Sequence, residues 1–278
     1  KVTLVCTVMP VITFLANYPE LLKKYDLSSL RCIINGAVSL EPESARRFQE
    51  LTGVSVIQGY GLSETSPVTN ICPLSQIKLG SVGPPLPDTQ QKIVDLEKGT
   101  KELPPGKIGE ILVKGPQVMK GYWKRHEETA EVLTDDGWLH TGDVGKIDED
   151  GYLYITDRKK EIIKYMGFTI GPAELEGVLM EHPAVADCAV IGKPDPISVE
   201  IPKAFVRLKG GAKVSKDELI KFVGGKVAGY KRIREVEFVK SIPRAPDGKV
   251  LRMEFIKEER KRAGIEIIHE YLERIYEA

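Results

Sequence analysis

The chain has 278 residues, and its 40 Lys and Arg side chains balance its 40 Asp and Glu side chains. The zero net charge excludes a general attraction to nucleic acid or to an anionic membrane surface. No apolar run approaches the ~20 residues that a membrane-spanning helix needs. We therefore expect a folded cytoplasmic protein of about two domains, without a transmembrane segment.

The four cysteines indicate neither a metal cluster nor a disulfide framework. They are far apart and form no Cys-x-x-Cys pair: Cys6, Cys32, Cys72 and Cys188. Reduced thiols fit a cytoplasmic location. The chain starts at Lys1, inside an apolar run that is typical of the middle of a domain, so we expect a fragment of a longer protein.

The first third of the chain alternates strand-like and helix-like segments. Short apolar runs of strand length occupy residues 2–8, 30–37 and 54–61. Segments of helical spacing lie between them, at residues 10–25 and 41–53. This alternation predicts a parallel sheet with connecting helices. We assign residues 1–84 to the remainder of a large α/β domain.

The rest of the chain has a different pattern. From residue 85 to 157, short strands interrupted by Gly, Pro and Asp-Gly turns predict a small antiparallel barrel or sheet. Residues 158–262 predict a compact α+β domain, with an N-cap at Ser215 and Glu218 three residues later. An amphipathic helix over residues 263–278 packs either internally or against a partner, and a homodimer is one alternative.

The most informative stretch follows the third predicted strand. Gly59 and Gly61 flank Tyr60, and glycines allow a backbone to approach a ligand closely. The Tyr60 ring could cover a flat base, and the Thr65 hydroxyl could reach phosphate oxygens. Glu64 could hold Mg²⁺, which prefers hard oxygen ligands. A glycine-rich turn around a core tyrosine explains the spacing equally well.

Other candidate residues have ordinary structural alternatives. Asp143 could accept both hydroxyls of a ribose, although a turn Asp commonly bonds its own backbone. His140 could act as a base or be structural, and Gly36 could simply end a strand. Pro-Asp-Gly before Lys249 predicts an exposed turn, and Arg252 is expected to form a surface ion pair.

Taken in order and spacing, five segments resemble the adenylate-forming superfamily. It comprises acyl-CoA synthetases, aryl-CoA ligases, firefly-type luciferases and the adenylation domains of peptide synthetases. The segments are NGAVSL (35–40), QGYGLSETSP (58–67), GEILVKGPQVMKGYW (109–123), the unbroken run at 136–176, and PRAPDGKVLR (243–252). They span the chain up to about residue 260, and the run DRKKEIIKYMGFTIGPAELE is most similar to fatty or medium-chain acyl-CoA ligases.

The resemblance implies a two-step reaction. A carboxylate attacks the α-phosphate of Mg·ATP, and the thiol of coenzyme A then displaces AMP from the acyl-adenylate. The resemblance also implies the nucleotide contacts. Gly36 and Ala37 would border the adenine and Tyr60 would stack on it, while Thr65 would contact the α-phosphate and Glu64 would coordinate Mg²⁺.

The remaining implied residues divide between the nucleotide and the moving domain. Asp143 would hold the ribose hydroxyls, and Arg158 would reach the ribose or a phosphate. Lys249 matches the lysine of the adenylation step. Lys160 matches the hinge about which the C-terminal domain rotates between steps, and coenzyme A would enter around Lys164 and Gly167.

The chain departs from the superfamily pattern in two places. The phosphate loop that normally lies upstream of NGAVSL is missing, so we expect this chain to be inactive by itself. The stretch at residues 194–206 lacks a usual glycine, which affects the coenzyme A surface. Two alternatives to a CoA ligase stay open: a ligase that loads a carrier-protein thiol, and a non-catalytic nucleotide-binding module. A luciferase-like oxygenase would need a special substrate that the sequence does not reveal.

Overall fold

The computed structural model describes residues 1–36, 42–245, 248–262 and 264. The chain divides into two compact units, one of residues Lys1–Lys159 and one that starts at Lys160. Each unit has its own hydrophobic core, so we describe the two separately. Ala37 and the helix expected at the C-terminus lie outside the described residues, apart from Gly264.

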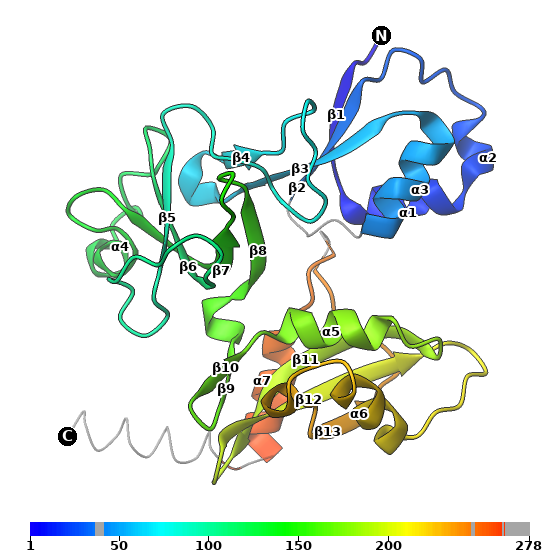
Figure 1. Ribbon diagram of the computed structural model, residues 1–278, viewed down its shortest axis with the longest axis vertical. Helices are drawn as coiled ribbons and strands as arrows, with labels where there is room; N and C mark the ends of the chain where they lie inside the picture. Colours follow the sequence, from blue (N-terminus) through cyan, green and yellow to red (C-terminus); the bar gives the residue numbers. More distant parts are fainter. Residues whose placement is uncertain (37–41, 246–247, 263, 265–278) are drawn as a thin grey trace. The chain divides into compact units, whose positions relative to one another are not determined.

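The first unit begins with a four-stranded sheet. Its strands, in spatial order, are β1 (Leu4–Val8), β2 (Cys32–Gly36), β3 (Ser55–Gly61) and β4 (Val68–Ile71). The first three are parallel and β4 is antiparallel to β3. The connecting helices are α1 (Met9–Asn17), α2 (Pro19–Leu22) and α3 (Pro42–Thr52). Ile12 of α1, Phe48 of α3 and Val56 of β3 are buried in one core cluster. The sheet with its connecting helices confirms the α/β prediction (Figure 1).

A second sheet completes the first unit. Its strands are β5 (Gln90–Val94), β6 (Gly109–Lys114), β7 (Leu139–Ile147) and β8 (Leu153–Arg158), each antiparallel to the next. Helix α4 (His126–Val132) lies between β6 and β7 in the chain. Of the two predicted alternatives, the structure has the open sheet and not a closed barrel. Tyr60 of β3 packs against the core of this second sheet, a cluster that includes Val82, Ile111 and Leu153. This contact joins the two sheets.

The second unit is an α+β domain, as predicted. Its sheet has the order β10-β9-β12-β11, and β13 pairs in parallel with β12. The strands are β9 (Ile163–Tyr165), β10 (Phe168–Ile170), β11 (Val185–Asp195), β12 (Val199–Leu208) and β13 (Glu235–Phe238). The helices are α5 (Pro172–Met180), α6 (Lys216–Gly224) and α7 (Arg252–Arg262). The Ser215 side chain accepts a hydrogen bond from the Glu218 backbone, which confirms the N-cap of α6.

Alternation along β12 sorts its side chains between two cores. Ala204 and Val206 belong to the core under α5 and α6, whereas Phe205 stacks on Phe255 of α7 with ring centroids 4.0 Å apart. Helix α7 therefore packs on the opposite face of this sheet from α5 and α6. No helix in the described part of the chain is long and apolar enough to cross a membrane.

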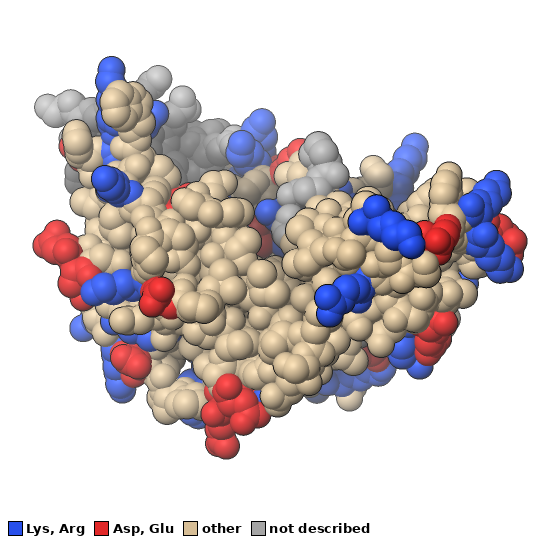
Figure 2. Space-filling view, turned by 90° about the horizontal axis from the view of Figure 1, so that it is seen from above, with Lys and Arg blue, Asp and Glu red and all other residues tan. Residues whose placement is uncertain are grey.

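The surface is mixed in charge, as the balanced composition predicts. Figure 2 shows Lys and Arg side chains interspersed with Asp and Glu side chains on the face in view, with uncharged residues between them. No single sign covers that face.

Candidate functional site

A buried carboxylate forms the centre of the candidate site in the first unit. Asp143 of β7 and Arg158 of β8 are cross-strand partners, and the Arg158 Nε donates to Asp143 Oδ1 at 2.8 Å. The Tyr60 hydroxyl donates to Asp143 Oδ2 at 2.7 Å. Burial, together with the nearby Asp143 charge, raises the pKa of Tyr60 far above its usual value, so its hydroxyl stays a donor at any physiological pH.

The backbone around Asp143 is fixed by its neighbours. The Thr141 hydroxyl donates to the Ile111 carbonyl at 2.7 Å and accepts from the Asp143 backbone at 3.1 Å. Gly142 between them has a φ of +68°, a conformation that side-chain-bearing residues rarely adopt. A carboxylate offers about four acceptor positions, and Tyr60 and Arg158 occupy two of them. Asp143 therefore retains acceptor capacity for two further hydroxyl donors, such as a vicinal diol.

Glu64 lies in a cavity of about 200 Å³ that has an acidic lining. Glu110 and Glu131 are the other two carboxylates of this lining. The Tyr122 hydroxyl donates to Glu64 Oε1 at 2.8 Å, and this bond raises the pKa of Tyr122. Among the described residues, no group of three or more His, Cys, Asp or Glu side chains is arranged to hold a metal by itself. A hard cation here would need oxygen ligands from elsewhere, and Mg²⁺ commonly takes them from substrate phosphates.

Glu110 was not anticipated as part of the site. Glu110 is only 2% exposed, and the Lys159 Nζ lies 2.7 Å from the Glu110 Oε2. The Nδ1 of His140 is 3.2 Å from the same oxygen, so His140 belongs to this cluster. The charge of Glu110 inside an apolar strand segment was the only signal in the sequence. The cluster ties the last residue of the first unit, Lys159, to the middle of that unit.

The Thr65 hydroxyl is engaged with its own backbone. Thr65 is fully buried, and its Oγ1 lies 3.0 Å from the Leu62 carbonyl and 2.9 Å from the Pro67 carbonyl. The Leu62 backbone N–H donates to the same oxygen at 3.0 Å. A contact with an α-phosphate would require this hydroxyl to exchange one of its present partners.

The predicted glycines have different local roles. A Cβ on Gly61 would lie 1.7 Å from the Pro67 carbonyl oxygen, so only glycine allows this close approach. A Cβ on Gly59 would meet the Asn70 carbonyl at 3.4 Å, a tight contact. Gly36 ends β2, and among the described residues no atom is within 4 Å of the place that a Cβ would take. Gly61 and Gly59 therefore serve packing between β3 and the segment that leads through β4.

In the second unit, the predicted thiol-transfer segment is the hairpin of β9 and β10. Its two-residue turn, Met166 and Gly167, has φ values of +47° and +83°, typical of tight hairpin turns. Lys164 is exposed, and its backbone N–H donates to Glu200 Oε2 at 2.8 Å. Phe168 is 51% exposed and stacks on Tyr230 with ring centroids 4.5 Å apart. The hairpin thus carries an exposed aromatic ring and an exposed lysine, and the pairing of Phe168 with Tyr165 and of Lys164 with Thr169 places the two on opposite faces.

Lys249 is exposed on the segment before α7. The Ala245 backbone N–H donates to the Lys249 carbonyl at 2.8 Å, and the Gly248 N–H donates to the Ala245 carbonyl at 2.8 Å. Arg244 Nη1 also donates to the Gly248 carbonyl at 2.7 Å. These bonds join Gly248 and Lys249 to Arg244 and Ala245, and we call these four residues the Lys249 turn.

The expectation of a surface ion pair for Arg252 is wrong. Its side chain is only 15% exposed and lies between Glu161 and Glu176, whose side chains are 13% and 14% exposed. Sequence separation explains the error, because the two partners are 91 and 76 positions away.

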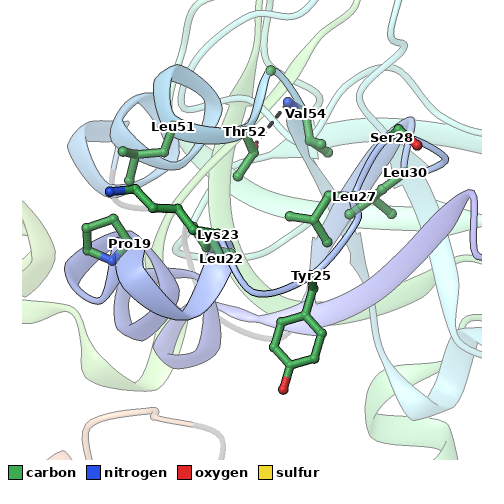
Figure 3. A pocket seen from close by; sticks show the side chains of 11 residues that line it. Pro19, Leu22, Lys23, Tyr25, Leu27, Ser28, Leu30, Leu51, Thr52 and Val54 are labelled. Carbon is green, nitrogen blue, oxygen red and sulfur yellow. Dashed lines mark hydrogen bonds between the residues drawn. The ribbon is translucent and has the colours of Figure 1, made fainter.

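A larger pocket in the first unit shares no residue with the site. It has a volume of about 440 Å³. Leu51 and Lys23 lie on one side of it and Leu27 and Leu30 on the other (Figure 3). Lys23 pairs with Glu20 at 2.8 Å, and no carboxylate lines the pocket.

Comparison with known proteins identifies the class. A family model described as AMP-binding enzyme matches residues 1–123, and one described as AMP-binding enzyme C-terminal domain matches residues 174–249. The chain belongs to the AMP-binding enzyme family, which confirms the resemblance seen in the sequence. Among solved structures, the chain is similar to ATP-bound MatB from Rhodopseudomonas palustris. The two are 35% identical, with a TM-score of 0.86 over 93% of this chain and 51% of that one. An anthranilate CoA ligase in complex with anthranoyl-AMP is 31% identical, with a TM-score of 0.78 over 94% of this chain and 51% of that one.

Curated relatives are CoA ligases. The long-chain-fatty-acid–CoA ligase of Bacillus subtilis is 46% identical over 88% of this chain and 43% of the relative. A 4-coumarate–CoA ligase of Oryza sativa is 42% identical over 93% of this chain and 47% of the relative. The chain therefore spans about half the length of the curated relatives it matches.

Proposed function

We propose that the protein containing this chain is an AMP-forming acid–thiol ligase. It activates a carboxylic acid with ATP to give an acyl-adenylate and pyrophosphate, and it then transfers the acyl group to coenzyme A with release of AMP. The observation that carries the proposal is the buried Asp143 carboxylate, oriented by Tyr60 and Arg158 and still able to accept two hydroxyl donors. The CoA ligases among the relatives support the choice of reaction.

The nucleotide would bind in the first unit. Asp143 accepts the ribose hydroxyls, and the exposed Arg158 side chain reaches the ribose or a phosphate. Gly36, Ala37 and Tyr60 border the adenine. Because Tyr60 packs against Val82 and Ile111, only part of its ring is available for stacking.

Mg²⁺ would be held by Glu64 together with the phosphates of ATP. The acidic lining of the Glu64 cavity favours a cation, and a single protein carboxylate suffices when phosphates supply further ligands. When bound, the ion offsets negative charge on the phosphates. Tyr122 holds Glu64 in place through the 2.8 Å hydrogen bond. Thr65 contacts the α-phosphate if its hydroxyl exchanges a carbonyl partner.

Lys249 would act in the first step only. Its ammonium group is a compact positive charge, suited to a transition state in which negative charge is redistributed between the carboxylate and the α-phosphate. Rotation at Lys160 would then withdraw Lys249 and bring the hairpin with Lys164 and Gly167 to the nucleotide. The exposed Phe168 ring on that hairpin, stacked on Tyr230 of a separate turn, supports the passage of coenzyme A there.

The acid is proposed to be a fatty acid. The support is the 46% identity to a long-chain-fatty-acid–CoA ligase, although several relatives are 4-coumarate–CoA ligases. An apolar pocket discriminates only about 1–3 kcal/mol per methylene, so several chain lengths should react. A carrier-protein thiol as acceptor is the alternative, and product analysis with free coenzyme A separates the two.

The experiment compares the complete protein with this chain alone. The complete protein should form acyl-CoA, AMP and pyrophosphate from a fatty acid, ATP and coenzyme A. This chain alone should be inactive, because it spans about half the length of its curated relatives. A complete protein that forms neither acyl-adenylate nor acyl-CoA from fatty or aromatic acids would overturn the proposal. Acyl transfer by the isolated chain would overturn the claim of inactivity.

A further inference from the structure

Arg252 bridges two carboxylates from distant parts of the second unit. Its Nη1 donates to Glu161 Oε2 at 2.8 Å. Its Nε and Nη2 donate to the two oxygens of Glu176 at 3.0 and 2.6 Å. A planar guanidinium can make this forked bond and a further bond at the same time, and a lysine ammonium cannot reproduce the geometry.

The two partners of Arg252 come from different parts of the second unit. Glu176 of α5 also accepts the Val190 backbone N–H of β11 at 2.7 Å, so its carboxylate is tied to the sheet. Glu161 is the second residue of the unit that begins at the expected hinge residue, Lys160. Arg252 therefore connects the segment that directly follows Lys160 to the start of α7.

A second arginine holds the other end of the Lys249 turn. Arg244 donates to both oxygens of Asp187 on β11, at 3.3 Å from Nε and 2.6 Å from Nη2. Its Nη1 also holds the Gly248 carbonyl, directly before Lys249. The turn is thus fixed to the sheet through Arg244 and to the segment after the hinge through Arg252.

The other side of the hinge is fixed within its own unit. Lys159 is bonded to the buried Glu110, as described above. Lys160 lies between two anchored neighbours, Lys159 on one side and Glu161 on the other, and it is itself exposed. Backbone rotation concentrated at Lys160 would leave both ion pairs intact.

We propose that Arg252 is a positioning residue, which fixes the Lys249 turn relative to the hinge so that rotation at Lys160 places the ammonium group accurately. This inference rests on the proposed function and names how Lys249 is aimed. In this proposal Arg252 has no contact with the substrates. It acts through Glu161, Glu176 and the first turn of α7, and a small displacement of a reacting group can reduce a rate by about two orders of magnitude.

The test uses the complete protein and separate half-reactions. Arg252→Lys keeps the positive charge but loses the pair of parallel hydrogen bonds to the two oxygens of Glu176. Pyrophosphate exchange should fall by roughly 10- to 100-fold in kcat with little change in the KM for ATP. Transfer from preformed acyl-adenylate to coenzyme A should stay within about threefold, because Lys249 has no part in that step. Glu161→Gln should lower exchange selectively and by less.

Coupling to Lys249 separates positioning from general damage. In the Lys249→Ala background, adding Arg252→Lys should cause no further loss of adenylation, because there is no ammonium left to aim. Arg46→Lys is the control, since Arg46 contacts both oxygens of Glu43 through its Nη2 on an exposed helix surface. It should change neither half-reaction.

Each contrary result has a definite meaning. Normal exchange in Arg252→Lys, an equal loss in both half-reactions, or a further full loss in the double variant would overturn the inference. Normal exchange in Lys249→Ala would instead overturn the role of Lys249 in the proposed function. The two failures are therefore distinguishable.

Discussion

Tyr60 and Asp143 are separated by 83 positions in the chain and are joined by a 2.7 Å hydrogen bond. Tyr60 belongs to β3 of the first sheet and Asp143 to β7 of the second. The bond lies where the two sheets of the first unit pack together, so the same contact stabilises the unit and orients the candidate nucleotide site.

Tyr60→Phe should affect both stability and nucleotide binding. It removes one donor from the buried Asp143 and leaves the ring in the core. A hydrogen bond to a charged group contributes about 1.5–3 kcal/mol, so the free energy of unfolding should fall by about that amount in urea titrations. The KM for ATP in pyrophosphate exchange should rise several-fold, since Asp143 loses part of its orientation.

Two results would contradict this prediction. Unchanged stability would mean that water replaces the hydroxyl without cost. Unchanged KM together with lower stability would mean that Tyr60 is only a core residue. Thr156→Val offers a matched control, because the Thr156 hydroxyl bonds a backbone carbonyl of the same sheet, at 3.1 Å from Val144.

Asp95 should make stability depend on pH in the acid range. Backbone N–H groups of Lys98 and Lys101, and then Thr100 and Gly99, donate to it and lower its pKa from 3.8 to about 2. A lowered pKa in the folded state stabilises the protein above the unfolded pKa, and this contribution is lost as pH falls from about 4 through about 2.

Unfolding of wild type and Asp95→Asn at several pH values tests this effect. The variant should be less stable at pH 7, and the difference should shrink as pH falls through this window. A constant difference from pH 7 to pH 2 would show that the Asp95 charge has no part. Asp26, whose carboxylate caps a shorter turn through Ser28, provides a comparison with a smaller expected effect.

The ionic cluster beneath α7 should be essential for folding of the second unit. Lys203 is 2% exposed and donates to Glu237 at 2.8 Å and to Glu259 at 2.9 Å. Lys203→Met would remove the buried cation from Glu259, whose side chain is 1% exposed and which would keep only Arg262 at 2.9 Å and Lys193 at 3.9 Å, at a cost of up to about 3–5 kcal/mol. Thermal and urea unfolding measure the loss. Adding Glu259→Gln should recover part of it, and a double variant less stable than the single one would contradict this explanation.

Lys160→Pro should separate the two half-reactions. Proline fixes φ and would restrict rotation at the position between the anchored residues Lys159 and Glu161. Transfer from preformed acyl-adenylate to coenzyme A should slow more than pyrophosphate exchange does, and Lys160→Ala is the control that leaves φ unrestricted. Equal slowing of both half-reactions would argue against Lys160 as the hinge.

Local patterns predicted the fold well. Strand-length apolar runs, helical spacing and turn residues were enough for the α/β and α+β architecture, because each element is specified by its own few residues. The N-cap at Ser215 was readable for the same reason. Closure of the second sheet was not decided by sequence, since an open sheet and a small barrel share the same strand and turn pattern.

Long-range charge partners could not be predicted. Glu110 was unremarked in its strand, and its burial depends on Lys159, 49 positions later. Arg252 was expected to form a surface ion pair, but its partners come from α5 and the segment after Lys160. Such contacts are set by tertiary packing, and a single sequence does not indicate which charged residues form ion pairs.

Pyrophosphate exchange by Lys249→Ala in the complete protein tests the central claim most directly. Lys249 is proposed to stabilise charge in the adenylation step alone. Exchange should fall by at least about 100-fold, while transfer from preformed acyl-adenylate to coenzyme A should continue near the wild-type rate. Exchange at the wild-type rate, or loss of both reactions together, would contradict the account.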